Sequence, residues 1–264
     1  MPWTFAHPAA VLPLRRYCPR WLSFPALIVG AMMADLSYYL PFPDFSPEAH
    51  TLEGSLLICA PCGLLLLGML YAWRIPLIHL LPQPHRGAFA RVFTHRVPLN
   101  LATLLTIVCS LVIGALTHVA WDSVTHLRGG LVEHIAWLQA TLFQIGEVDI
   151  PVFRAAQHIS SAAGAAALLW TYRRWLHAHA FKRRGVPADE RWRWLLLAGI
   201  ASMSLLWAWH SASQSAIDPT LLARLPAFGR EMAIHGAILF VSCYLLCAAI
   251  VLRRAGYPIR RRNT

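Results

Sequence analysis

Six apolar stretches run along the chain, and the polar segments between them are alternately rich and poor in arginine. The stretches cover residues 22–40, 55–73, 99–121, 152–172, 194–209 and 232–252. A helix of about 20 mostly apolar residues is long enough to cross the hydrocarbon core of a bilayer. Asp35 interrupts the first stretch and the fifth is short, but the pattern as a whole predicts about six transmembrane helices. We therefore expect an all-α, polytopic membrane helix bundle that forms a single domain over residues 1–264.

The composition excludes an ordinary soluble domain, because 57% of the 264 residues are hydrophobic and only 13% are charged. The net charge of +11 would suit a nucleic-acid-binding protein, but the basic residues are sorted along the chain. Of the 23 lysines and arginines, 19 lie within residues 15–20, 74–96, 173–193 and 253–262. The positive-inside rule places these segments and the C-terminus in the cytoplasm and the remaining loops outside. Because the sequence has no basic module with interleaved aromatic residues, we expect membrane lipids and not nucleic acid as partners.

A motif of strong metal ligands closes the third apolar stretch, where His118, Asp122 and His126 recur at every fourth position. On an α-helix each such step turns about 40° beyond a full turn, so the three side chains share one face within an arc of roughly 80°. Two imidazoles and a carboxylate on one face suit a divalent cation, with zinc as the first candidate and manganese as the second. The alternative is a helix end whose polar side chains simply meet water.

The predicted topology brings further polar residues to the same outer side. Asp35 lies near the outer end of the first stretch, and His50 lies in the first outer loop. Gln157 and His158 open the fourth stretch, where they would contact a substrate or support a ligand imidazole. Otherwise they are ordinary polar residues at a helix end. The convergence predicts one polar site near the outer face.

The N-terminal segment needs a separate interpretation, because residues 1–14 are apolar and contain the pair His7-Pro8. We predict a short re-entrant helix over residues 8–14 that descends into the protein and turns at residues 15–20. Proline suits the first turn of such a helix. The first apolar stretch would return antiparallel to this element and bring His7 close to Asp35. The alternative is a solvated histidine at the cytoplasmic face.

Five motifs follow one another along most of the chain. They are His7-Pro8-Ala9-Ala10-Val11-Leu12-Pro13-Leu14, Asp35 with Tyr38, His50-Thr51, residues 118–126, and Gln157-His158 followed by Ser160-Ser161. In this order they resemble domain-of-unknown-function family 4184, a group of uncharacterised bacterial membrane proteins, and membership implies no established activity. More distantly, the series is similar to membrane-bound metal-dependent hydrolases and zinc-dependent phospholipase C. Those proteins bind catalytic metals with histidine and aspartate side chains from several helices.

The distant resemblance implies five metal ligands, namely His7, Asp35, His50, His118 and Asp122. It also makes Asp35 the carboxylate that activates water. This sequence departs from the pattern of those proteins in two places. Ala34 stands where a proline usually precedes this aspartate, and the second His-x-x-x-Asp/Glu pair of the phospholipase pattern is not evident. A site for one or two metal ions is therefore expected rather than a site for three.

The resulting hypothesis is a metal-dependent hydrolase in the bacterial inner membrane. It would cleave an ester or phosphoester of a lipid or lipid-linked substrate at a site toward the outer face, with the C-terminus in the cytoplasm. The main alternative is a transporter or scaffold that uses the same His/Asp cluster as an ion or proton path. A third hypothesis is a haem protein in which His118 and His158 face each other as axial ligands.

Overall fold

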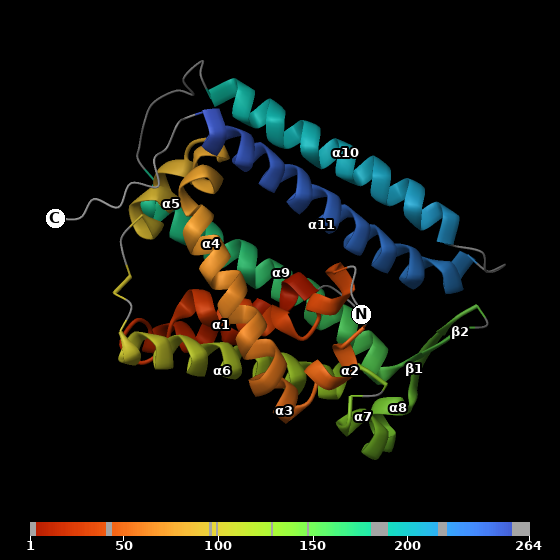
Figure 1. Cartoon of the computed structure of the whole chain (residues 1–264). Helices are drawn as coiled ribbons and strands as arrows, with labels where there is room; N and C mark the ends of the chain where they lie inside the picture. Colours follow the sequence, from red (N-terminus) through yellow and green to blue (C-terminus); the bar gives the residue numbers. More distant parts are fainter. Residues whose placement is uncertain are drawn as a thin grey trace.

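The computed structural model of the chain describes residues 4–40, 44–94, 97–98, 100–127, 129–146, 148–180, 190–215 and 221–254. These residues form an all-α fold with one small β-hairpin (Figure 1). Two of the elements, η1 and η2, are 3₁₀ helices, and η3 is a π-helical turn. In chain order the elements are η1 (Thr4–Tyr17), α1 (Phe24–Met33), η2 (Leu36–Tyr39), α2 (Ser46–Ala49), α3 (Leu52–Gly54), η3 (Ser55–Cys59), α4 (Ala60–Leu80), α5 (His85–Phe93), α6 (Leu101–Thr125), α7 (Leu131–His134), α8 (Ala136–Gln139), β1 (Thr141–Ile145), β2 (Val148–Pro151), α9 (Val152–His179), α10 (Arg191–Ser215) and α11 (Leu221–Arg254). Parts of the predicted basic segments, residues 181–189 and 255–264, lie outside the described residues.

Four helical segments in the described part of the chain are long and apolar enough to cross a membrane. They are Leu52–Leu80, Leu101–Thr125, Arg191–Gln214 and Ala227–Arg254. These segments correspond to the second, third, fifth and sixth predicted stretches, so the prediction of a polytopic membrane protein is confirmed. The first stretch instead divides around Asp35 into the ten-residue α1 and the short η2. The fourth is the 28-residue helix α9, which carries basic side chains near both ends and is not among the four.

The predicted N-terminal helix is present, but it is a 3₁₀ helix and it begins before Pro8. Pro8 and Pro13 lie inside η1, where they remove two backbone N–H donors and so disfavour a regular α-helix. Thr4, His7 and Val11 are buried in the protein. Because η1 packs against α1, α6 and α9, the backbone around its buried residues faces protein, which is the condition for irregular backbone at membrane depth.

The core of the bundle is the contact between α1 and α6. Gly30 and Gly114 allow the two backbones to approach closely: a Cβ on Gly30 would lie 2.2 Å from the Leu111 carbonyl oxygen, and one on Gly114 would lie 2.3 Å from the Leu27 carbonyl oxygen. Small residues at helix interfaces commonly permit such close packing in membranes. Because the approach is this close, polar groups of α6 can reach the main chain of α1.

The helices α10 and α11 form a hairpin along one side of the bundle (Figure 1), with α11 against α4. A buried ion-pair cluster anchors the start of α10. The Glu190 side chain is 1% exposed, pairs with Arg86 and Arg193, and accepts a hydrogen bond from the Gln83 backbone N–H at 3.1 Å. Arg193 also donates to the His79 carbonyl oxygen at 2.9 Å. The hairpin is thus joined to the end of α4 and to α5.

Candidate metal centre

Five side chains from separate parts of the chain meet at one end of α6. They are His7 from η1, Asp35 between α1 and η2, His50 at the end of α2, and His118 and Asp122 from α6. Two groups within the set, His7–Asp35–His118 and His50–His118–Asp122, have ligand atoms that lie within 4.8 Å of one another. The structure therefore brings together the five residues that the distant resemblance implies, including His7 beside Asp35.

The three histidines share one orientation, which the main chain sets. Each Nδ1–H donates to a backbone carbonyl oxygen: His7 to Thr4 (3.3 Å), His50 to Ser46 (2.7 Å) and His118 to Ala31 (2.8 Å). A carbonyl oxygen can only accept, so in the neutral imidazole this contact places the proton on Nδ1 and leaves the lone pair on Nε2. All three Nε2 atoms face the two aspartates. This arrangement of an imidazole held from behind by a carbonyl is typical of metal-ligating histidines.

The Nε2 atoms and the carboxylate oxygens surround a common space. Asp35 Oδ1 lies 3.5 Å from the Nε2 atom of His50 and 3.7 Å from that of His118. Asp122 Oδ2 lies 3.4 Å from the same two nitrogen atoms, and its Oδ1 lies 3.0 Å from His7 Nε2. The rings of His7 and His118 stack with their centroids 3.9 Å apart. Most of these separations are longer than a good hydrogen bond, as expected for ligands arranged around an ion.

His118 Nε2 is the atom that best tests whether a metal fits. The side chain is completely buried, and this nitrogen is without a hydrogen-bond partner in the described part of the chain. A buried polar atom without a partner is costly and calls for an explanation such as an ion. Three imidazole nitrogens with two carboxylates also form a donor set that suits zinc. The residues therefore fit a divalent cation.

The carboxylates also control the charge of His50, the most accessible of the three histidines. Burial lowers the pKa of its imidazole, but the contacts with Asp122 and Asp35 outweigh burial and raise the pKa to about 10. The pair of aspartates therefore favours a positive charge at this position. A divalent cation would satisfy the same two negative charges, because two carboxylates balance a charge of +2.

Thr4 is a supporting residue that the sequence analysis did not identify. Its hydroxyl donates to Asp35 Oδ2 at 2.6 Å, and it accepts a hydrogen bond from the Tyr39 hydroxyl at 3.2 Å. Asp35 Oδ2 is thereby occupied, while Oδ1 remains directed toward the histidines. The position of Thr4, one 3₁₀ turn before His7, was the only signal available in the sequence.

His126 occupies a different place from the one that helical spacing predicts. The helix α6 ends at Thr125, and His126 has extended backbone angles (φ −123°, ψ 142°), so the four-residue repeat does not reach it. Its Nδ1 lies 3.2 Å from Asp122 Oδ1, and its Nε2 contacts Gln157 Nε2 at 2.8 Å. It belongs to neither of the two candidate ligand groups. In this arrangement both ring nitrogens are engaged, and His126 holds Asp122 from the side.

The two residues predicted for substrate contact have different placements. Gln157 bonds to His126, which is the supporting position that the sequence analysis considered for it. His158 is exposed on α9, and no contact between its ring and the five clustered residues is present among the described residues. A substrate role for either residue stays a prediction.

A model of a protein family, described as a domain of unknown function (DUF4184), matches residues 1–253. Because this match covers nearly the whole chain, the protein belongs to that family. No curated protein and no solved structure gives a significant match.

Proposed function

We propose that this member of the DUF4184 family is a membrane-bound hydrolase that requires a divalent cation, with zinc as the expected ion and manganese as the second candidate. The proposed reaction is hydrolysis of an ester or phosphoester in a lipid or lipid-linked substrate. One observation carries the proposal: three histidines, each fixed by a carbonyl oxygen, direct their Nε2 atoms at two buried aspartates.

The ligand set supports one or two ions. His118 belongs to both candidate groups, but its Nε2 has a single lone pair and can bind one ion at a time. A first ion would take His118 with Asp122 and His50, or with Asp35 and His7. A second ion would depend on the carboxylates and the remaining imidazole. The resemblance to three-metal phospholipases therefore does not extend to three ions here.

A bound divalent cation supplies Lewis acidity, which lowers the pKa of water from 15.7 toward about 7 and polarises an acyl or phosphoryl oxygen. The chain itself supplies the base. Thr4 holds Oδ2 of Asp35, so Oδ1 is the atom that accepts a proton from the attacking water. Burial of Asp35 and His118 excludes bulk solvent from that side of the site.

The surroundings of the more open ligands support a lipid substrate. His50 and Asp122 are the least deeply buried ligands, with side chains 23% and 11% exposed, and His126 lies beside Asp122. Leu52, two residues after His50, is 74% exposed, and Leu127, which follows His126, is 56% exposed. Exposed leucines beside a polar site suit a substrate with an acyl or prenyl chain. The sorting of basic residues further supports a site at the outer face of the bacterial inner membrane, with the C-terminus in the cytoplasm.

Metal analysis of the purified protein tests the proposal. Full-length wild type in detergent is compared by mass spectrometry with His118→Ala and Asp122→Ala, after confirming that each variant elutes as a folded particle. His134→Ala is the matched control, because that histidine is exposed and its ring donates to the Gly130 carbonyl oxygen. We expect near-stoichiometric zinc or manganese in wild type and control, and loss of it in both site variants. Equal trace metal in all four folded proteins would contradict the proposal.

The same buried charges favour a second function, because ionisable groups at membrane depth often mark ion or proton paths. Asp35→Asn separates the two functions. For a hydrolase whose ion is held by His50, His118 and Asp122, loss of this base lowers turnover of phospholipid or lipid-phosphate substrates by about 10²–10⁴-fold while that ion is retained. A transporter would show no hydrolysis in wild type, and it would show ion-dependent uptake into vesicles.

A further inference from the structure

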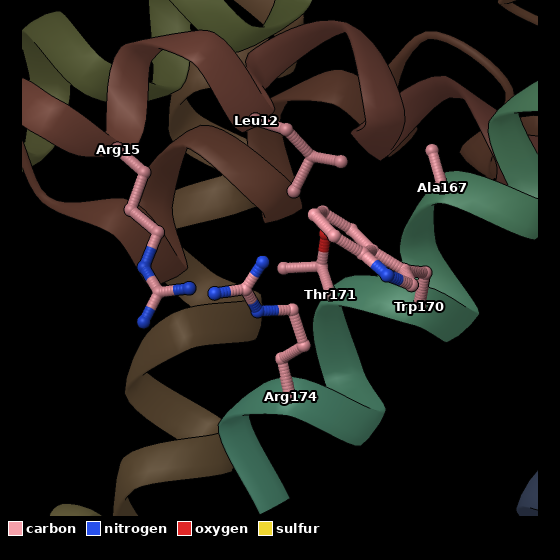
Figure 2. A pocket seen from close by; sticks show the side chains of 6 residues that line it. All are labelled: Leu12, Arg15, Ala167, Trp170, Thr171 and Arg174. Atoms are coloured by element: carbon pink, nitrogen blue, oxygen red, sulfur yellow. The ribbon is translucent and has the colours of Figure 1, made fainter. Parts of the chain in front are cut away.

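A groove lies between η1 and α9, away from the metal centre. Its volume is about 410 Å³, which lies within the range of small-molecule sites. Figure 2 shows the side chains that line it: Leu12, Arg15, Ala167, Trp170, Thr171 and Arg174. Along α9, the groove begins at Ala167, ten residues beyond Gln157, a distance of roughly 15 Å for an α-helix. It is therefore a separate site.

Two guanidinium groups converge in this groove. Figure 2 shows the side chains of Arg15 and Arg174 pointing toward one another from η1 and α9. Like charges at close range repel, and no ion pair joins either arginine to a carboxylate in the described part of the chain. An anion between the two guanidinium groups would turn this repulsion into two attractive contacts. The pair therefore indicates an anion site.

Aromatic rings hold both guanidinium groups in place. Arg174 lies over the ring of Trp170 at 4.8 Å from its centroid, and Arg15 lies over the ring of Phe24 at 5.7 Å. A guanidinium stacked on a ring keeps its N–H donors at the edge, where they suit the oxygens of a phosphate group. Thr171 adds a hydroxyl to the same groove. These groups together suit a phosphate better than an uncharged, apolar ligand.

The rest of the lining favours a lipid over a soluble phosphate. Leu12, Ala167 and Trp170 give the groove an apolar wall beside its charged end. The basic residues at 15–20 and 173–174 also mark this end of the bundle as the one where the positive-inside rule places the cytoplasmic headgroup region. Basic pockets between helices at that level are suited to anionic headgroups.

We propose that the groove between η1 and α9 binds the phosphate of an anionic phospholipid from the adjacent leaflet, through Arg15 and Arg174, with an acyl chain along Leu12 and Trp170. This site goes beyond the proposed hydrolase function and does not depend on it. The headgroup would also link η1, which carries His7, to α9, which carries Gln157.

Native mass spectrometry of the delipidated, full-length protein tests the proposal, with phosphatidylglycerol as the anionic probe and phosphatidylcholine as the zwitterionic one. The test variant is Arg15→Gln/Arg174→Gln. The control is Arg16→Gln/Arg173→Gln, which removes the same charge from exposed neighbours on the same two elements. We expect wild type and control to retain one phosphatidylglycerol in preference to phosphatidylcholine. The test variant should bind it about a hundredfold more weakly, since each hydrogen bond between charged groups contributes about tenfold or more.

Three results would overturn the proposal. The first is equal phosphatidylglycerol binding by wild type and the test variant, and the second is an equal loss in the control, which would mean unspecific surface charge. The third is full displacement of the lipid by millimolar inorganic phosphate, which would make the ligand a free phosphate. If the test variant fails to fold, Leu12→Trp serves instead. The larger side chain occupies the apolar part of the groove and keeps both arginines, so it should still weaken lipid retention.

Discussion

The Nδ1–H of His118 donates to the main-chain carbonyl oxygen of Ala31 at 2.8 Å, and this bond joins the candidate metal centre to the packing of α1 on α6. The bond fixes the tautomer of the buried imidazole and directs its Nε2 into the cluster. It forms only because the two helices approach closely at Gly30 and Gly114. Helix packing and ligand geometry are therefore coupled.

That coupling predicts that Gly114→Ala damages the metal centre without touching a ligand. The new Cβ would lie 2.3 Å from the Leu27 carbonyl oxygen and 2.8 Å from the Ala31 backbone nitrogen, so α1 must move away. We expect a loss of about 1–3 kcal/mol in stability and a fall in bound metal, measured by thermal unfolding and mass spectrometry. Gly68→Ala is the control, because a Cβ there meets nothing within 4 Å. Full metal content in Gly114→Ala would show that the close approach is not required.

A second prediction concerns the threonine behind Asp35. Thr4→Val keeps the shape of the side chain but removes the donor to Asp35 Oδ2, leaving the carboxylate free to rotate. Loss of such a supporting partner lowers metal affinity or activity by about 10–100-fold. Thr4→Ser should restore most of the loss, since it returns the hydroxyl. Affinity is measured by competition with a chelator. Thr106→Val serves as a control, because its hydroxyl donates to the Ala102 carbonyl oxygen of its own helix.

A third prediction distinguishes a ligand from a supporting residue at His126. If His126 only holds Asp122, His126→Ala retains metal at saturating concentration but binds it about 10–100-fold more weakly. Gln157→Leu should show a smaller effect in the same direction, because it removes one contact to the ring. The same chelator titration measures both variants. A loss as complete as that in His118→Ala would show instead that His126 is a ligand.

The placement of His126 could not be predicted from the sequence. The four-residue spacing correctly placed His118 and Asp122 on one face, because both lie inside α6. It could not reveal that the helix ends at Thr125 and that the next residue is extended. Periodicity describes a helix only as far as the helix continues, and its last residue depends on tertiary contacts.

Other parts of the site were open to prediction for a different reason. The proximity of His7 to Asp35 was predicted from an apolar N-terminus followed by a basic turn, a pattern that suits an element that enters the protein and returns. Thr4 and the carbonyl oxygen of Ala31 could not be predicted, because main-chain acceptors and short hydroxyl side chains have no distinctive sequence pattern. Similarly, hydropathy gave six apolar stretches, but it did not show that Asp35 would divide the first of them into α1 and η2.

The last prediction separates stability from the metal centre. Glu190 is buried against Arg86 and Arg193, so Glu190→Gln removes the carboxylate charge that both arginines contact. Breaking a buried pair by removing one partner costs about 3–5 kcal/mol, which corresponds to a fall of roughly 6–20 °C in Tm for a chain of this size. The metal content should not change, because α10 contributes no residue to the cluster. Glu133→Gln is the control: that side chain is exposed, and its loss should leave Tm within about 2 °C. A Glu190→Gln variant that melts like wild type would show that the ion pairs of Glu190 do not anchor the α10–α11 hairpin.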